Sequence, residues 1–185
     1  GVVTDDGAKL TSNEEVAWHK VVTDAAHQDG AKICMQILHT GRYAMVRQPV
    51  APSAIQAPIN PARPRALSLE EVKQTVQDYI RCAQLAQQAG YDGVEVMGSE
   101  GYLINQFIAK RTNQRDDEYG GNLENRHRFA QEIVAGIRAA CGDDFIIIFR
   151  LSVLDLVEDG STWEDNLQLI ARIEAAGASM FNTGI

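Results

Sequence analysis

The stretch that decides the fold is Tyr91–Tyr119, which reads YDGVEVMGSEGYLINQFIAKRTNQRDDEY. It opens with a short apolar run, Gly93–Met97, whose glycine boundaries predict a buried strand. Gly98–Tyr102 follows at once, and its glycines let the backbone turn where polar groups cluster. In a barrel of parallel strands, residues just beyond the carboxyl end of a strand line the active site. We therefore expect the chemistry of this protein at Tyr102.

The same order of elements recurs along the chain: a helix, a glycine, a short apolar strand and a polar loop. Capping-box patterns at Ser12–Glu15 and Ser68–Glu71 predict the starts of two helices. Strands that are apolar on both faces indicate a parallel sheet covered by helices. The pattern predicts helices over residues 12–28, 68–90, 122–140 and 162–176, a helical turn over 103–108, and strands over 33–38, 93–97, 145–151 and 179–182.

This pattern fits either a doubly wound sheet or a (β/α)8 barrel. The sequence pattern shows only four strands, whereas a full barrel has eight. A full barrel also needs about 250 residues. A small four-stranded α/β domain is one interpretation. The other, which we favour, is the middle of a TIM barrel whose two ends lie outside the sequence. The proline-rich residues 39–67 have no clear periodicity and are predicted to form a functional loop.

Composition narrows the class of protein. The chain has 185 residues, of which 45% are apolar, and a net charge of −8, which disfavours binding to nucleic acid. No apolar run is long enough for a membrane span, and no signal peptide is recognisable at a start that lacks Met. Cys34, Cys82 and Cys141 are widely spaced, which is typical of reduced thiols in a cytoplasmic protein and predicts no metal site.

Two polar side chains interrupt the apolar strands. Arg150, in FIIIFRLS, is a cation among apolar neighbours and needs an anionic or strongly polar partner. An ion pair with a carboxylate such as Glu95 or Asp155 is one explanation. Gln36, in CMQIL, needs donor and acceptor partners if it is buried. By itself, Gln36 is best explained as a satisfied amide of the core.

Together, an inward glutamine and an inward arginine on neighbouring strands also suit the pyrimidine edge of a flavin. The amide of Gln36 can pair with a ring N–H and a carbonyl, while Arg150 stabilises negative charge on the reduced ring. Tyr102 carries a phenol that is protonated at neutral pH and can act as a general acid. Without further context, it is better explained as a core aromatic residue. His39 and Arg42 are weaker candidates for contact with a ligand.

Several stretches carry a resemblance to a known family. They are QILHTGRYA, VAPSAIQAPIN, RCAQLAQQAGYDGVEVMGSEGYLINQF, RTNQR, YGGNLENRHRFAQEIV, DFIIIFRLSVLDLVEDG and IEAAGASMFNTGI. On these stretches the chain resembles the old yellow enzyme family of FMN-dependent oxidoreductases. Within that family it is most similar to the bacterial NADPH-dependent 2,4-dienoyl-CoA reductases. The resemblance extends from about Gly30 to Ile185.

The resemblance implies a (β/α)8 barrel that holds FMN, with residues 1–185 as a partial barrel domain covering roughly the third to sixth strands. It implies that Gln36 lies at the pyrimidine edge of the flavin and that Arg150 lies near N1 and the C2 carbonyl. Tyr102 would bind the substrate and protonate its carbon after hydride arrives from flavin N5. Arg111 would contact an acyl-CoA substrate.

The chain also departs from the family pattern. Met97 and Glu100 stand where many members carry a histidine and an asparagine that hold the substrate carbonyl oxygen. Because Met97 cannot donate a hydrogen bond, this difference disfavours the reduction of simple enones by that arrangement. The variant GSEGYLIN instead resembles the dienoyl-CoA reductase branch. Tyr119–Gly121, with Asn125 and Arg126, match a signature that we interpret as structural, since it would fix the loop after the strand at Gly93.

The resemblance therefore implies an oxidoreductase that reduces 2,4-dienoyl-CoA in the β-oxidation of unsaturated fatty acids. A parent protein would draw electrons from NADPH through FAD and a 4Fe–4S cluster, whose motifs are not in this sequence. A stand-alone FMN ene-reductase or an amine dehydrogenase relative is an alternative. An inactive partial barrel is another, because half a barrel leaves two open sheet edges. We expect the 185-residue chain alone not to turn over; its oligomeric state stays open.

Overall fold

A computed structural model of the chain describes residues 3–4 and 7–184. In chain order, its elements are α1 (Asn13–His27), β1 (Cys34–Ile37), the 3₁₀ helix η1 (Gly41–Tyr43), β2 (Val50–Ala51), β3 (Arg65–Ala66), α2 (Leu69–Gln88), β4 (Gly93–Gly98), α3 (Leu103–Ile108), α4 (Leu123–Cys141), β5 (Ile146–Ser152), α5 (Trp163–Ala175) and β6 (Met180–Gly184).

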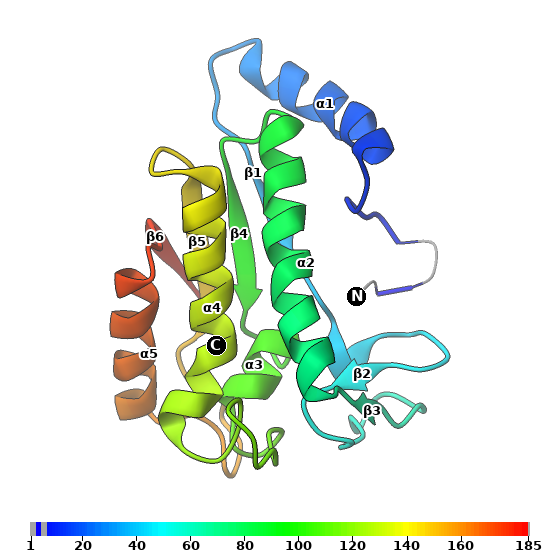
Figure 1. Ribbon diagram of the computed structural model, residues 1–185, viewed down its shortest axis with the longest axis vertical. Coiled ribbons are helices and arrows are strands. Elements are labelled where there is room, and N and C mark those ends of the chain that lie inside the picture. Colours follow the sequence, from blue (N-terminus) through cyan, green and yellow to red (C-terminus); the bar gives the residue numbers. More distant parts are fainter. Residues whose placement is uncertain (1–2, 5–6, 185) are drawn as a thin grey trace.

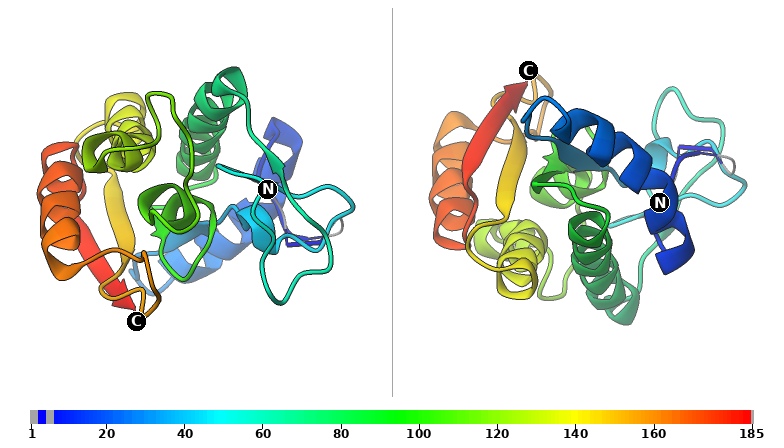
Figure 2. Two further views of the ribbon diagram at one scale, coloured as in Figure 1. Left: turned by 90° about the horizontal axis from the view of Figure 1, so that it is seen from below. Right: turned by 90° about the horizontal axis from the view of Figure 1, so that it is seen from above.

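A four-stranded parallel sheet forms the centre of the molecule, in the order β1-β4-β5-β6. Helices α2, α4 and α5 follow one another along one side of this sheet (Figure 1). Seen along the strands, the same helices lie on its outer side (Figure 2). The strands point toward α3 and the small parallel pair β2–β3 (Figure 1). This is the predicted succession of helix-connected parallel strands.

Burial differs between the two faces of the sheet. On the face toward the helices, the side chains of Val94, Val96, Ile147 and Phe149 have no exposed surface. The opposite face carries Gln36, which is exposed, and the partly buried side chains of Glu95, Arg150 and Asn182; Met97 on this face is buried. The strands were predicted to be apolar and buried on both faces, which is wrong for this second face. That face is where a polar ligand can reach the strands.

The helix boundaries fall close to the predicted ones because the caps are real. Glu71 N donates to Ser68 Oγ at 3.2 Å, and Ser68 N donates back to Glu71 Oε2 at 2.8 Å. Asn122 caps α4 in the same manner, since its Oδ1 accepts from Asn125 N at 2.9 Å. The predicted loop over residues 39–67 is different in detail. It contains η1, β2 and β3, which are too short to show periodicity.

The helices of the described residues include none that is long and apolar enough to cross a membrane. Cys34, Cys82 and Cys141 are unpaired. Within residues 3–4 and 7–184, no three side chains of His, Cys, Asp or Glu are grouped so that they could hold a metal ion.

Candidate active site at the open face of the sheet

A polar network lies on the open face of the sheet. The Glu95 carboxylate in β4 accepts hydrogen bonds from Gln36 Nε2 and from Asn182 Nδ2, each at 2.6 Å. Gln36 and Glu95 meet because they are partners in the parallel register of β1 and β4. Since the Gln36 side chain is exposed, its interpretation as a core amide is wrong. None of the described residues donates a hydrogen bond to Gln36 Oε1, so this oxygen can serve a ligand.

Arg150 in β5 lies on the same face and forms an ion pair. Its Nε and Nη2 donate to Glu100 Oε1 at 3.0 and 2.6 Å. These hydrogen bonds raise the pKa of the Arg150 guanidinium, which therefore keeps its charge. An ion pair was expected, but the suggested partners were wrong. Glu95 binds the two amides, and Asp155 accepts from Asn105 Nδ2 at 3.1 Å.

The turn after β4 places the Glu100 carboxylate against Arg150. Glu100 has a φ of 60°, a left-handed conformation that is uncommon for a residue with a side chain. Its N–H donates to Ser152 Oγ at 2.9 Å. Gly101 follows with a φ of 75°, and a Cβ atom there would lie 2.8 Å from Tyr43 Cε2. The turn needs glycine at this position for both reasons.

Tyr102 forms the N-cap of α3 and is partly buried. Its ring meets the ring of Tyr43 edge to face, with centroids 6.1 Å apart. Among residues 3–4 and 7–184, none forms a hydrogen bond with its hydroxyl group. The explanation of Tyr102 as a core residue therefore accounts for the ring and leaves the hydroxyl without a structural role.

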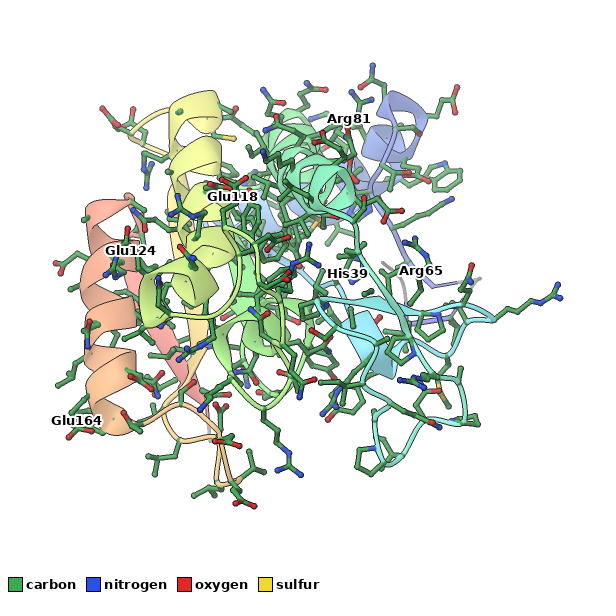
Figure 3. The ribbon with its side chains drawn as sticks, turned by 60° about the horizontal axis from the view of Figure 1, so that its bottom comes forward. His39, Arg65, Arg81, Glu118, Glu124 and Glu164 are labelled. Carbon is green, nitrogen blue, oxygen red and sulfur yellow. The ribbon has the colours of Figure 1, made fainter. Side chains whose placement is uncertain are left out.

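The side chains of His39 and Met97 are poorly suited to donate hydrogen bonds to a ligand. His39 lies at the end of β1, beside the loop that holds β2 and β3 (Figure 3). Burial lowers its pKa to about 3, so the ring is neutral, and Nδ1 accepts from Gly41 N at 3.0 Å. Met97 is 4% exposed, and Ser99 Oγ lies 3.6 Å from its sulfur. The position of Met97 therefore offers no hydrogen-bond donor to a ligand.

Arg111 lies at the rim, beyond α3. Its N–H donates to Asp159 O at 2.9 Å, and its Nη1 donates to Glu158 O at 3.2 Å. The exposed side chain lines a hollow of about 590 Å³ together with Arg42 and Lys110. The structure thus separates Arg111 from the group formed by Gln36 and Arg150, which lies on the strands themselves.

The signature around Tyr119–Gly121 has contacts that agree with a structural role. Arg126 Nε donates to Ile108 O at 2.9 Å, and its Nη1 donates to Gly121 O at 2.8 Å. The Tyr119 hydroxyl donates to Glu132 Oε2 at 2.7 Å. These bonds tie the loop before α4 to the end of α3.

The open face fits the pyrimidine edge of a flavin. It offers a hydrogen-bond acceptor at Gln36 Oε1 and a cation at Arg150. The Nη1 of Arg150 donates no hydrogen bond to any of the described residues. The two residues were expected on neighbouring strands, which is wrong, because β4 lies between β1 and β5. Their Cα atoms are therefore separated by about 10 Å across two strand spacings and by about 7 Å along the strands. Both side chains are long enough to converge on one flat ring between them.

Sequence reasoning missed the partners that hold these groups. Glu95 was named only as a possible partner of Arg150, and Asn182 was included only as the last residue of the predicted strand over residues 179–182. The alternation of side chains along β4 could have placed Glu95 on the same face as Met97. Its meeting with Gln36 depends on the strand register, which the sequence does not reveal.

Comparisons with known proteins agree with this geometry. The model of the NADH:flavin oxidoreductase / NADH oxidase family matches residues 1–183. An NADH oxidase from Thermoanaerobacter brockii is 38% identical over 179 residues, which are 94% of this chain and 28% of that protein. An NADPH dehydrogenase from Bacillus subtilis is 33% identical over 183 residues, which are 98% of this chain and 54% of that protein.

A solved structure of 2-naphthoyl-CoA reductase in complex with 2-naphthoyl-CoA superposes with a TM-score of 0.92 at 33% identity. The match covers 100% of this chain and 31% of that one. The chain therefore spans about half or less of the length of the relatives that it matches.

Proposed function

The chain belongs to the NADH:flavin oxidoreductase / NADH oxidase family, and from this premise we propose that the whole protein is an FMN-dependent reductase of activated carbon–carbon double bonds. The (β/α)8 barrel is the fold of its structural neighbours, and the four parallel strands described above are part of that fold. The proposal concerns the whole protein because the chain spans only part of its relatives.

The open face would hold the pyrimidine end of FMN. When it is bound and reduced by NADH or NADPH, FMN supplies a hydride to the substrate. Gln36 would accept a hydrogen bond from a ring N–H through Oε1, because Glu95 already binds its Nε2. Arg150 would stabilise negative charge on the ring while Glu100 keeps the guanidinium in place.

Tyr102 would give the proton that completes the reduction. Its hydroxyl has no hydrogen bond to the described residues, and its ring is held by the edge-to-face contact with Tyr43. A positioned phenol can donate to a carbon on which negative charge develops. The observation that carries the proposal is the pairing of the Gln36 amide oxygen with the Arg150 guanidinium on the open face, together with the hydroxyl of Tyr102 in the turn that follows β4.

We further propose that the substrate is a CoA thioester such as a 2,4-dienoyl-CoA, as in the β-oxidation of unsaturated fatty acids. Met97 supports this, since it offers no donor for the carbonyl oxygen of a simple enone. In that case, Arg111 would contact the CoA portion. Electrons would pass from NADPH through FAD and a 4Fe–4S cluster outside residues 1–185. A stand-alone ene-reductase fed directly by NADH or NADPH is the second candidate, because NADPH dehydrogenases match this chain.

The test uses the full-length protein under anaerobic conditions and follows flavin absorbance. We expect NADPH to reduce the flavin and 2,4-hexadienoyl-CoA to reoxidise it. Tyr102→Phe should slow reoxidation by about 10²–10⁴-fold, the usual contribution of a general acid, and leave reduction by NADPH unchanged. Tyr79→Phe is the matched control. This phenol is buried and lies on α2, outside the turn that carries Tyr102.

Two results would refute parts of the proposal. An unchanged rate of reoxidation in Tyr102→Phe would remove Tyr102 from the chemistry. Reoxidation of the wild-type protein by cyclohexenone, but not by any CoA thioester, would favour the stand-alone ene-reductase over the dienoyl-CoA reductase.

A further inference from the structure

A positively charged hollow lies at the rim of the candidate active site. It has a volume of about 590 Å³ and is lined by Arg42, Lys110, Arg111 and Arg115, with Asp159 as the one carboxylate among the lining residues of the described chain. The complete sequence has a net charge of −8, so a group of four cations beside one acid runs against its general composition. Such a concentration of positive charge attracts anions.

One of the four cations is already used by the structure. Arg115 donates to Asp117 through Nε and Nη2, and its Nη1 donates to Pro52 O at 2.9 Å and to Leu67 O at 2.6 Å. Its side chain is only 9% exposed. Arg115 therefore forms a wall of the hollow and has little capacity left for a ligand.

The other three cations keep most of their capacity. Arg42 makes one long hydrogen bond, from Nη1 to Gln56 O at 3.4 Å, and its buried Nε has no partner in the described part of the chain. Lys110 is 69% exposed and lies 3.9 Å from Asp159. Arg111 uses Nη1 for the Glu158 carbonyl. A multiply charged anion could bind to all three, and guanidinium groups match phosphate oxygens well.

The hollow is connected to the site of chemistry by short segments of chain. Arg42 precedes Tyr43, whose ring contacts Tyr102. Arg111 lies after α3, whose N-cap is Tyr102 and whose six residues span about 9 Å. A ligand that reaches both places must therefore be extended, with its reactive group at Tyr102 and its anionic group at the rim.

We propose that Arg42, Lys110 and Arg111 form a binding site for the phosphate groups of a nucleotide-bearing ligand of this enzyme. The inference rests on the proposed function, because the ligand must also present a reactive group to Tyr102. Phosphate groups occur both on a CoA thioester substrate and on NADH or NADPH. The hollow would bind the phosphate groups that these ligands share. It would thereby provide polar contacts to the ligand that Met97 cannot provide.

The experiment measures ligand affinity in the oxidised full-length flavoprotein. The probes are crotonyl-CoA and its N-acetylcysteamine thioester, which has the same acyl group and no phosphate. Each cation that contributes a charge-assisted hydrogen bond should account for about tenfold in affinity. We therefore expect Lys110→Ala/Arg111→Ala to weaken the binding of crotonyl-CoA by about 10–100-fold and to leave the affinity for the truncated thioester unchanged. Arg111→Lys should recover part of the loss.

Two further variants sharpen the measurement. Asp159→Asn removes the negative charge beside Lys110 and should tighten the binding of crotonyl-CoA severalfold. Asparagine tolerates the φ of 57° found at this position. Lys20→Ala on α1, which removes an exposed lysine that pairs with Asp24, should have no effect. Raising the salt concentration should weaken the binding of crotonyl-CoA more in the wild type than in the double variant.

The outcomes are distinct. Equal loss for both thioesters would show a structural effect and overturn the proposal, as would unchanged affinity for crotonyl-CoA together with an unchanged concentration dependence of flavin reduction by NADH and NADPH. A change confined to the concentration dependence of flavin reduction would assign the phosphates to the reductant and support the site. A wild-type protein that binds crotonyl-CoA through these cations but reduces no double bond would refute the proposed function and leave the phosphate site in place.

Discussion

The replacement of Glu95 by glutamine gives the sharpest test of how the open face binds a flavin. The Glu95 carboxylate can only accept, so it fixes Gln36 Nε2 as its donor at 2.6 Å and leaves Gln36 Oε1 for the ring. In Glu95→Gln, the new amide can both donate and accept. The amide of Gln36 then loses its fixed orientation, and FMN should bind less tightly.

The magnitude follows from the type of hydrogen bond that is changed. A hydrogen bond to a charged group contributes about 1.5–3 kcal/mol and a neutral one about 0.5–1.5 kcal/mol, so the change costs about 1 kcal/mol. This corresponds to a roughly fivefold higher Kd for FMN. Electrostatics alone predicts the opposite sign, because the loss of a negative charge should favour the anionic FMN. The direction of the change therefore separates the two explanations.

The assay titrates the full-length apoprotein with FMN and follows the quenching of flavin fluorescence. Glu95→Gln should weaken binding in the wild-type background and have no such effect in Gln36→Ala, because the two residues act as a pair. Asp24→Asn on α1 removes an equal charge outside the site and is the matched control. Tighter or unchanged FMN binding in Glu95→Gln would refute the orientation of Gln36 by Glu95.

Three other predictions follow from contacts described above. Arg150→Ala should lower the flavin reduction potential and weaken FMN binding, since it removes the cation of the open face; a normal potential and a normal flavin content would contradict this role. Gly101→Ala should reduce the free energy of unfolding, measured with urea, by about 1–3 kcal/mol because of its positive φ and its contact with Tyr43; Gly121→Ala, with a φ of 77° and open space around it, should cost less. His127 has a pKa lowered to about 4 by burial and by the nearby Arg172 and Arg126. As the pH is lowered, His127 is therefore protonated in the unfolded state before it is protonated in the folded state. The free energy of unfolding should fall by up to about 1.4 kcal/mol for each pH unit as the pH is lowered from 6.5 to 4. His127→Leu should flatten this dependence, and an equal slope in both proteins would exclude His127 as its source.

Much of the fold could be predicted because its signals are local. The capping residues Ser68 and Glu71 satisfy backbone groups within one turn, so the start of α2 can be read from four residues. The apolar run at β5 and the glycines after the helices are equally local signals. The pair β2–β3 could not be predicted, since two-residue strands have no pattern and depend on contacts between distant segments.

The site was predictable only in part for a related physical reason. Arg150 stands out in an apolar strand, and the need for a carboxylate partner follows from its charge. Which carboxylate it binds depends on the left-handed backbone of Glu100, a conformation that no sequence rule assigns to glutamate. Likewise, the fold places Arg42 in the same hollow at the rim as Lys110 and Arg111, although Arg42 is far from these two residues in the sequence.

We propose that the two groups of charges serve two different ligands, the flavin ring on the open face and the phosphate groups of an extended ligand at the rim. On the open face, Glu100 holds Arg150, and the Glu95 carboxylate is bound by two amides, so this face would recognise a flavin ring through the direction of its hydrogen bonds as well as through the charge of Arg150. At the rim, three cations face one carboxylate and attract an anion from a distance. If the rim cations hold the phosphate groups of the substrate as proposed, the position of Met97 needs no hydrogen-bond donor to hold the substrate. Loss of the rim cations should therefore raise KM far more than it lowers kcat, whereas loss of the Tyr102 hydroxyl should lower kcat and leave KM largely unchanged.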